Sequence, residues 1–331
     1  MKLGLAYDLK EAMAQNLQQK TEDALEEYDS PETVEAIASV FRNQGHLVIK
    51  LGGGRAFLES ILKERVDFTF NIAEGSGSYR SREAQVPSVL EMLDIPYSGA
   101  DPQCLAVCLD KPLTKKLVAL AGVETPRWAV FDRPGDITRD AVKGLHFPLF
   151  VKPAWEGSSK GIRLTSRIES FERLVEAVGR LFKAYRQPVM AEEFVQGDEV
   201  TVGVVGNNPV RVIGIMRIVP RQPDPDFIYS LEVKRDWERL VEYECPAELP
   251  PGVMKKIEDS ALKVFHVVGC RDFGRLDFRV NSRGVPYFLE INPLPGLNPH
   301  SGDLPIMAGK MGWAYESLVT AVFEAARARY A

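Results

Sequence analysis

Hydrophobic and polar positions alternate most regularly within residues 271–296. Apolar side chains occupy every second position from Leu276 to Val280, and charged side chains occupy the positions between them. A period of two predicts a β-strand. Residues 281–284, Asn-Ser-Arg-Gly, have turn chemistry because Gly tolerates positive φ. Residues 286–291 predict a returning strand, so a hairpin is expected here.

The N-terminal part of the chain shows short apolar runs separated by amphipathic segments. The apolar runs predict strands at residues 2–7, 46–51 and 66–72. Ser30 followed by Pro31 marks the start of a helix that is expected to end before Gly45, and a second helix is predicted at residues 83–93. Residues 8–29 are polar and are expected to form a loop or an exposed helix. Strands and helices at this spacing predict a doubly wound α/β domain with a parallel sheet.

A second unit begins near Phe147. A strand ends at Lys152, a Gly- and Ser-rich loop spans residues 156–161, and a return strand is expected at residues 162–164. Residues 221–237 hold two prolines and are expected to form a mobile cover loop. The remaining predicted elements are strands at residues 189–195 and from residue 197, and helices at residues 170–184, 257–268 and 315–330.

Composition and charge limit the class of protein. The chain has 331 residues, enough for two or three domains, and its 45% hydrophobic and 26% charged residues are ordinary for a folded globular protein. The net charge of -5 and the pI near 5.6 argue against nucleic acid or an anionic membrane as the main partner. No apolar run approaches a membrane span, and the N-terminus lacks a signal-peptide pattern, so a cytoplasmic location is expected.

Several conspicuous groups are assigned no chemistry. Cys104, Cys108, Cys245 and Cys270 lack the partners of a zinc site and are expected to be buried free thiols. Residues 52–54, Gly-Gly-Gly, are not followed by Gly-Lys-Ser/Thr, so they predict a flexible turn rather than a phosphate loop. Lys115 and Lys116 are expected to be solvated.

The predicted hairpin carries three oxygen donors. Asp277 lies on the first strand, and Glu290 and Asn292 lie at the end of the second. Two carboxylates and an amide suit Mg²⁺, which also shares its coordination shell with substrate phosphates. Arg275 is on the same face as Asp277 and can hold an anion beside the metal. The alternative is a surface hairpin whose charges face water, but acids that interrupt apolar strands need a partner or a metal.

Two loops are candidate walls of a site. Backbone N–H groups and hydroxyls of residues 156–161 can wrap a polyphosphate, with Lys152 as an inward cation. By itself such a small-residue loop is a weak signal. The polar, Gly-rich residues 71–80 follow the third predicted strand, and ligands bind at the carboxyl ends of strands in such sheets.

The order of these motifs is similar to that of the ATP-grasp enzymes, and the chain most closely resembles the D-alanine–D-alanine ligase family. The matching segments are IPYSGADP (95–102), LDK (109–111), VKPAWEGSSKG (151–161), AEEFVQGDEVTV (191–202), GRLDF (274–278) and LEINPLPG (289–296). The resemblance implies an N-terminal α/β domain at residues 1–108 and an ATP-grasp fold of two subdomains, at residues 109–195 and 196–331. It also implies ATP between the last two subdomains and a homodimer formed through the first.

The resemblance assigns nucleotide-binding roles to individual residues. They are Lys111 and Lys152 at the ATP phosphates, Glu192 and the backbone near Val195 at adenine, Glu199 at the ribose, and Lys234 at the end of the cover loop. Asp277, Glu290 and Asn292 are implied to bind two Mg²⁺ ions, for which Mn²⁺ can substitute.

The resemblance also implies residues at the reacting groups. Arg275 and the backbone near Gly296 would stabilise the transferring phosphoryl group and the later oxyanion. Ser158 matches a serine of the family's catalytic network. Ser301 is implied to contact the carboxylate of the second amino acid.

The sequence departs from the family where the amino-acid pockets are expected. The N-terminal Gly-Gly-x-Ser-x-Glu signature is absent, so only Glu26 or Glu27 could supply the acid for the first amino group. Asn71 replaces a family His, Arg235 replaces the cover-loop Tyr, and an insertion follows Ser301. Arg235 suggests a more anionic or differently shaped second substrate.

The sequence therefore predicts an ATP-dependent carboxylate–amine ligase that joins two amino acids through an acyl phosphate. D-alanine–D-alanine ligation in peptidoglycan precursor synthesis is the first hypothesis. The altered pockets, including the inserted Gly302-Asp303, raise the alternative of a ligase for other amino acids or peptides outside cell-wall synthesis. A nucleotide-binding protein that has lost catalysis is a further alternative, against which the intact Lys152, Arg275 and metal ligands argue. A purely structural α/β protein is the least favoured hypothesis.

Overall fold

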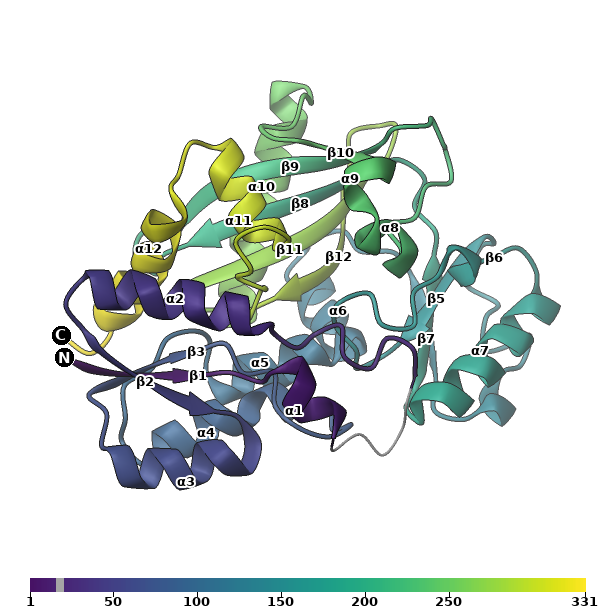
Figure 1. Cartoon of the computed structure of the whole chain (residues 1–331). Coiled ribbons are helices and arrows are strands. Elements are labelled where there is room, and N and C mark those ends of the chain that lie inside the picture. The colour runs from purple at the N-terminus through teal and green to yellow at the C-terminus, as the bar shows by residue number, and fades with distance from the viewer. Residues whose placement is uncertain (16–20) are drawn as a thin grey trace.

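The computed structural model describes residues 1–15 and 21–331 (Figure 1). The described strands form a parallel sheet near the N-terminus and two antiparallel sheets, one in the middle of the chain and one in its C-terminal part. Within these residues, none of the helices combines the length and the apolar character that crossing a membrane requires.

The N-terminal sheet is parallel, as predicted. β1 (Lys2–Ala6) lies between β2 (Leu47–Gly52) and β3 (Phe68–Asn71). Leu3 and Leu5 of β1 and Phe70 of β3 are fully buried, because helices cover both faces of the sheet. The doubly wound arrangement expected for this part of the chain is confirmed.

Helices on both faces complete the N-terminal unit. α2 (Pro31–Asn43) lies on one face of the sheet, and α3 (Gly54–Glu64) and α4 (Gln85–Met92) lie on the other (Figure 1). α2 begins at the predicted cap, because the Ser30 hydroxyl accepts a hydrogen bond from the Thr33 N–H at 3.2 Å. The three glycines do not form the expected flexible turn: Gly52 ends β2, Gly53 is the N-cap of α3 and Gly54 is its first residue.

The described residues between β1 and α2 form a short, mostly exposed helix and a series of turns, in agreement with the expected loop or exposed helix. The helix is α1 (Lys10–Ala14), and the segment buries three acids: Asp8, Asp23 and Glu27. Asp23 accepts hydrogen bonds from the Gly161 N–H at 2.8 Å and from the Tyr185 hydroxyl at 2.6 Å. The burial of these acids was not predicted, because their partners lie far away in the sequence. The part of the segment at residues 16–20 lies outside the described residues.

The middle sheet has the order β4 (Trp128–Phe131), β7 (Val189–Glu193), β5 (Leu149–Pro153) and β6 (Arg167–Ile168). α7 (Phe171–Tyr185) packs against it through Leu174, Val178 and Leu181. The return strand predicted at residues 162–164 was wrong. The chain turns there, with Ile162 N–H donating to the Ser159 carbonyl at 3.0 Å, and pairs with β5 only at β6.

The C-terminal sheet carries the hairpin that the sequence predicted. Its strands run in the order β10 (Val241–Glu244), β9 (Arg211–Pro220), β8 (Asp198–Val205), β11 (Phe273–Val280) and β12 (Pro286–Asn292). The β11–β12 register sets Asp277 opposite Glu290 and Arg275 opposite Asn292. The metal-ligand candidates therefore meet on adjacent strands because of the pairing alone.

The remaining helices connect and cover the two antiparallel sheets (Figure 1). They are α5 (Pro102–Leu109), α6 (Lys111–Leu120), α8 (Leu231–Arg235), α9 (Trp237–Leu240), α10 (Pro251–Val267), α11 (Asp303–Lys310) and α12 (Tyr315–Arg327). α10 begins earlier than predicted, because Pro251 at its first position is compatible with a helix start. The expected cover loop contains α8 and reaches the first residue of α9.

The N-terminal and C-terminal sheets share one hydrophobic core. Phe323 of α12 contacts the rings of Phe41 and Phe68, with centroid distances of 5.2 Å in both pairs. These aromatic side chains are among the fully buried residues of a cluster that also includes Leu276 and Phe278 of β11. The last helix thus ties the N-terminal unit to the sheet that carries the hairpin.

Asp272, just before β11, is a buried ionic junction between these units. Its carboxylate accepts hydrogen bonds from the Gly99 N–H at 2.7 Å, the Asn207 amide at 2.8 Å and the Arg329 guanidinium at 2.8 Å. The side chain has 0% exposure, and the backbone has a left-handed φ of 65°. Asp272 therefore joins the N-terminal unit, the end of β8 and the C-terminus.

Replacing Asp272 with Asn should lower the free energy of unfolding by about 3 kcal/mol, because it leaves the Arg329 guanidinium without its anion. Asn tolerates the left-handed backbone, so the effect should report the charge. The matched control is Asp94→Asn, at an exposed aspartate with a φ of 55°. Urea unfolding measures both variants, and equal midpoints would contradict the role given to Asp272.

Candidate active site

The β11–β12 hairpin brings together the residues predicted to bind a metal. The Asp277 carboxylate lies 3.3 Å from the Asn292 amide nitrogen and accepts a hydrogen bond from the Thr201 hydroxyl at 2.7 Å. Glu290 faces Lys111, with 3.3 Å between carboxylate and ammonium. Burial opposes ionisation of Glu290, but Lys111 and Lys152 outweigh it and hold its pKa at about 2. The site therefore keeps this carboxylate ionised at neutral pH.

This donor set fits a hard divalent cation. Two carboxylates and one amide, all oxygen donors, are the ligands that Mg²⁺ takes together with water and phosphate oxygens. Among the described residues no group of three or more His, Cys, Asp or Glu forms a metal site, so a third acidic ligand is not provided. The amide of Asn292 and the ligand phosphates would have to complete the shell.

Arg275 lies beside the candidate metal ligand Asp277, as predicted. Its guanidinium contacts Asp277 at 2.8 Å and Asp303 at 2.9 Å. Asp303 is buried and also lies 3.4 Å from the Tyr229 hydroxyl and 3.9 Å from the Lys234 ammonium. The sequence marked Asp303 only as part of an insertion, and its pairing with Arg275 becomes visible only in the structure.

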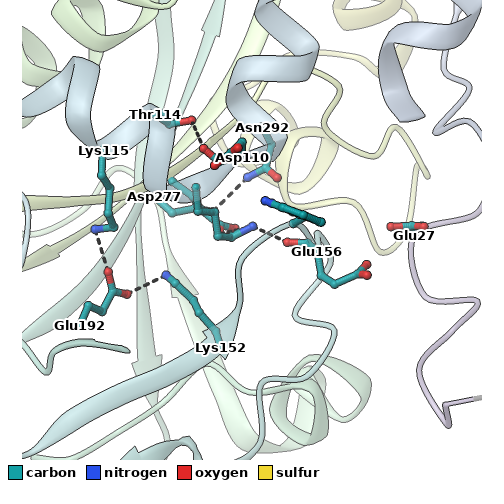
Figure 2. A network of polar contacts seen from close by, with 12 residues as sticks. Glu27, Asp110, Thr114, Lys115, Lys152, Glu156, Glu192, Asp277 and Asn292 are labelled. Atoms are coloured by element: carbon teal, nitrogen blue, oxygen red, sulfur yellow. Dashed lines mark hydrogen bonds and ion pairs between the residues drawn. The ribbon is translucent and has the colours of Figure 1, made fainter. Parts of the chain in front are cut away.

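Glu192 is held between two lysines (Figure 2). Its carboxylate lies 2.7 Å from the Lys115 ammonium and 2.7 Å from the Lys152 ammonium. Burial opposes the ionised Glu192, yet the two lysines lower its pKa below the ordinary value. Burial chiefly lowers the pKa of Lys115, to about 8. Glu192 thereby fixes the positions of both ammonium groups.

The expectation that Lys115 is solvated was wrong. Its side chain has 0% exposure and also donates to the Thr125 hydroxyl at 2.6 Å. Its neighbour Lys116 is exposed, as expected. The helical spacing from Lys111 to Lys115 was the available signal, because residues four apart lie on the same face of α6.

A first cavity lies between the middle and the C-terminal sheets. Most of the residues assigned to the nucleotide line it: Lys152, Glu192, Val195, Glu199 and Lys234. Apolar side chains such as Phe150, Ile218 and Leu289 line it as well, and so do charged residues of the hairpin, including Arg275, Asp277 and Glu290. The cavity encloses about 790 Å³, open solvent included, which is within the range of small-molecule sites.

A second, larger cavity adjoins the first and encloses about 1570 Å³, open solvent included. Tyr229, Lys234, Arg275 and Asp303 line both cavities and form their boundary. The predicted residues that line the second cavity are Lys111, Ser158, Asn292, Gly296, Ser301, Arg235 and Glu26. Asn71 is buried at the end of β3, where its side chain accepts a hydrogen bond from the Ala73 N–H, and in the described structure it borders neither cavity.

The Gly/Ser loop, residues 156–161, has several backbone φ angles in the left-handed region and is held by a residue of the N-terminal segment. Ser158 and Ser159 have φ of 49° and 58°, and Gly161 has φ of 76°. A Cβ at Gly161 would lie 2.5 Å from the Pro153 side chain, so glycine is required there. The Asp23 carboxylate holds the Gly161 N–H. The N-terminal segment thus helps to set the loop that borders both cavities.

Both acids considered for the first amino group already have basic partners. Glu26 lies 2.6 Å from the Arg235 guanidinium, which also pairs with Glu22 at 2.5 Å. Glu27 lies 2.8 Å from Arg82 and 3.1 Å from Lys160. The charge of Arg235 is balanced by these glutamates, so its pairing gives no support to an anionic second substrate.

Comparisons with known proteins point to a single family. The family model described as the D-ala D-ala ligase C-terminus matches residues 117–324. The D-alanine–D-alanine ligase of Aquifex aeolicus is 33% identical over 293 residues, which covers 88% of this chain and 94% of that protein.

Solved structures agree in fold. The D-alanine–D-alanine ligase of Bacillus anthracis complexed with ATP has a TM-score of 0.76 at 22% identity, covering 100% of this chain and 98% of that one. The VanG D-Ala:D-Ser ligase of Enterococcus faecalis has a TM-score of 0.72 at 22% identity, covering 98% and 99%. The matches confirm the expected ATP-grasp fold.

Replacing Lys115 with Met should lower the free energy of unfolding by about 3 kcal/mol, because Glu192 would keep only one of its two cations in a buried site. Lys116→Met on the exposed side of α6 is the matched control, with an expected change within about 0.5 kcal/mol. Chemical denaturation measures both. A Lys115 variant as stable as its control would mean that Lys152 alone compensates Glu192.

Proposed function

The chain belongs to the D-alanine–D-alanine ligase family, and we propose that it joins two D-alanine molecules in an ATP-dependent reaction, as a step in peptidoglycan precursor synthesis. The observation that carries the proposal is the arrangement of Arg275, Asp277, Glu290 and Asn292 on one hairpin between two cavities. One cavity suits a nucleotide, and the other has room for amino acids.

In the first step, a carboxylate oxygen of one amino acid attacks the γ-phosphorus of ATP. A new P–O bond forms, the bond to the β-phosphate oxygen breaks, and ADP leaves with the electron pair. Lys111 and Lys152 are proposed to hold the phosphates, and Arg275 to balance charge on the phosphoryl group as it moves. Mg²⁺ bound by the hairpin would neutralise phosphate charge and orient the transferring group.

In the second step, the amine of the other amino acid attacks the carbonyl carbon of the acyl phosphate. The tetrahedral intermediate places negative charge on oxygen, which Arg275 and the backbone N–H near Gly296 are proposed to stabilise. Collapse expels phosphate and leaves the peptide bond, and the amine loses a proton. The acyl phosphate is sensitive to water, so α8 and Tyr229 are proposed to exclude solvent above it.

Four finer assignments belong to the same proposal. The hairpin would hold two Mg²⁺ ions, with Mn²⁺ as a substitute, because the donors are hard oxygens. Glu192 and the backbone at Val195 would face adenine, and Glu199 the ribose. The chain would work in the cytoplasm, where ATP is available. It would form a homodimer through the unit at residues 1–108, as the resemblance implied.

One observation favours a second candidate, a ligase of the same type with other amino-acid substrates. Asp303 occupies a buried position at the boundary of the two cavities and neutralises part of the Arg275 charge. A carboxylate there would disfavour the carboxylate of an incoming amino acid, because like charges repel at short range. A different amine, or a rearranged Asp303, would then be needed.

Phosphate release from ATP and Mg²⁺ tests the proposal. D-alanine alone should support release, and Asp277→Asn should reduce it by about 100-fold or more, because a group that helps to stabilise transition-state charge is lost. Asp259→Asn, at an exposed aspartate on α10, is the matched control and should leave the rate unchanged. The product should be the dipeptide, as mass spectrometry can verify.

The other outcomes separate the alternatives. Release only with a different L- or D-amino acid would keep the reaction type and move the protein out of cell-wall synthesis. ATP binding without release in a broad amino-acid panel would identify a protein that has lost catalysis.

A further inference from the structure

Two glutamates of the N-terminal unit line the second cavity without a basic side chain in direct contact among the described residues. Glu74 belongs to the loop after β3, and Glu83 lies in the short helical turn (Arg82–Ala84) that precedes α4. Both side chains line the cavity. Glu83 is only 8% exposed, and neither carboxylate has a hydrogen bond or an ion pair with any described residue. Glu83 is thus nine-tenths buried, unpaired and directed at a cavity. Because a buried charge costs free energy unless it is paired, a ligand of opposite charge would stabilise its ionised form.

The basic side chains nearby are already engaged. The Arg82 guanidinium contacts Glu27 at 2.8 Å, Glu156 at 3.3 Å and the Trp155 carbonyl at 2.9 Å. Lys160 contacts the same two glutamates. With this compensation, which outweighs the effect of burial, the pKa of Glu27 is lowered to about 2. Glu27 is thus a satisfied structural acid rather than a free ammonium receptor.

The two glutamates without partners behave in the opposite way. Burial is the main cause that raises the pKa of Glu83, to about 7, and raises the pKa of Glu74 well above its ordinary value. Each carboxylate therefore costs free energy when it ionises without a ligand. A cation that enters the cavity would remove this cost, whereas an anion would increase it.

The position of Lys111 indicates how an amino acid would be oriented in the second cavity. Its charge acts on Glu83, and its ammonium lies 3.3 Å from the Glu290 carboxylate of the hairpin. An amino acid carries its positive and negative groups at opposite ends. With its ammonium at the glutamates, its carboxylate would point toward Lys111 and Asn292, which line the same cavity. That end is where the proposed phosphoryl transfer takes place.

We propose that Glu74 and Glu83, rather than Glu26 or Glu27, bind the ammonium group of an amino-acid substrate in the second cavity. The inference rests on the proposed ligase function, because it assigns the cavity to the amino acid that is phosphorylated. Ammonium is the shared chemistry, and it has two sources: the α-ammonium that every amino acid carries, or a side-chain ammonium of a basic one.

Calorimetric binding to the full chain with ADP and Mg²⁺ tests the site without relying on turnover. The probes are D-alanine, propionate (which lacks the ammonium), D-lysine and D-norleucine (which lacks only the side-chain ammonium). Wild type should bind D-alanine and not propionate. Glu83→Gln, Glu74→Gln and the double variant should weaken D-alanine by about 30-fold or more, because a buried ion pair is lost.

Two further variants sharpen the comparison. Glu26→Gln should weaken D-alanine far less than Glu83→Gln does. Glu59→Gln, at a glutamate on α3 whose side chain is 67% exposed, is the matched control and should change nothing. ADP affinity should stay constant in every variant.

Each outcome decides a point. In one outcome, D-lysine binds the wild type more tightly than D-norleucine does. If the double variant of Glu74 and Glu83 removes only this difference in affinity, the glutamates bind the side-chain ammonium. If the affinity for D-alanine falls in the glutamate variants, the glutamates bind the α-ammonium. Unchanged affinities for all probes would overturn the proposal. Normal binding without any phosphate release would instead refute the ligase function and leave the site standing.

Thermal unfolding tests whether Glu83→Gln weakens binding only because it destabilises the fold. The folded-state pKa of Glu83, about 7, lies above its unfolded value, so wild type should lose stability as the pH rises from about 4.5 through 7. The groups facing Glu83 are Arg82, Lys111, Glu27, Glu74 and Cys104. Glu83→Gln should therefore melt higher than wild type at pH 8 and similarly at pH 4.5. A lower melting temperature at pH 8 would show that the carboxylate stabilises the fold.

Discussion

Charge compensation in a buried space is the interaction on which the site depends. Glu192 is tolerable in the interior because Lys115 and Lys152 face it, and Glu290 because Lys111 does. Removing one partner from such a set leaves an unpaired charge in a medium that solvates it poorly. The cations that must meet phosphate groups are therefore held in place before any ligand arrives, and little reorganisation is needed when a ligand binds.

The same principle explains how separate parts of the chain meet around the cavities. Asp272 collects donors from the N-terminal unit, the end of β8 and the C-terminus, and Asp23 reaches from the N-terminal segment to the Gly/Ser loop. Phe323 adds an apolar contact between the first and the last sheets. A substrate cavity between such units is shaped by their junctions, so residues far from the chemistry determine its walls.

Two acidic residues of the second cavity, Glu83 and Asp303, depart from this pattern of paired charges. Glu83 is as deeply buried as many paired acids of this protein, yet its carboxylate forms no ion pair with a described residue. Asp303 shows the reverse case, because it adds an anion next to Arg275, a cation that the chemistry needs. Both departures lie in the cavity proposed for amino acids. In the first cavity, in contrast, Glu192 is paired with Lys152 and with Lys115.

The sequence by itself determined the hairpin and the metal-ligand candidates, because local periodicity and turn chemistry specify two strands joined by a turn. Asp277, Glu290 and Asn292 were found in this way, and Lys152 from its position at a strand end. The register of the two strands has an irregularity between Asp277 and Phe278 that only the structure shows. Only the tertiary structure decided that Lys115 is buried and that residues 162–164 form a turn. It also decided that Glu27 has basic partners, whereas Glu83 forms no ion pair with a described residue. These properties depend on partners more than fifty residues away in the sequence, or on a loop path fixed by long-range contacts, and no local pattern records them.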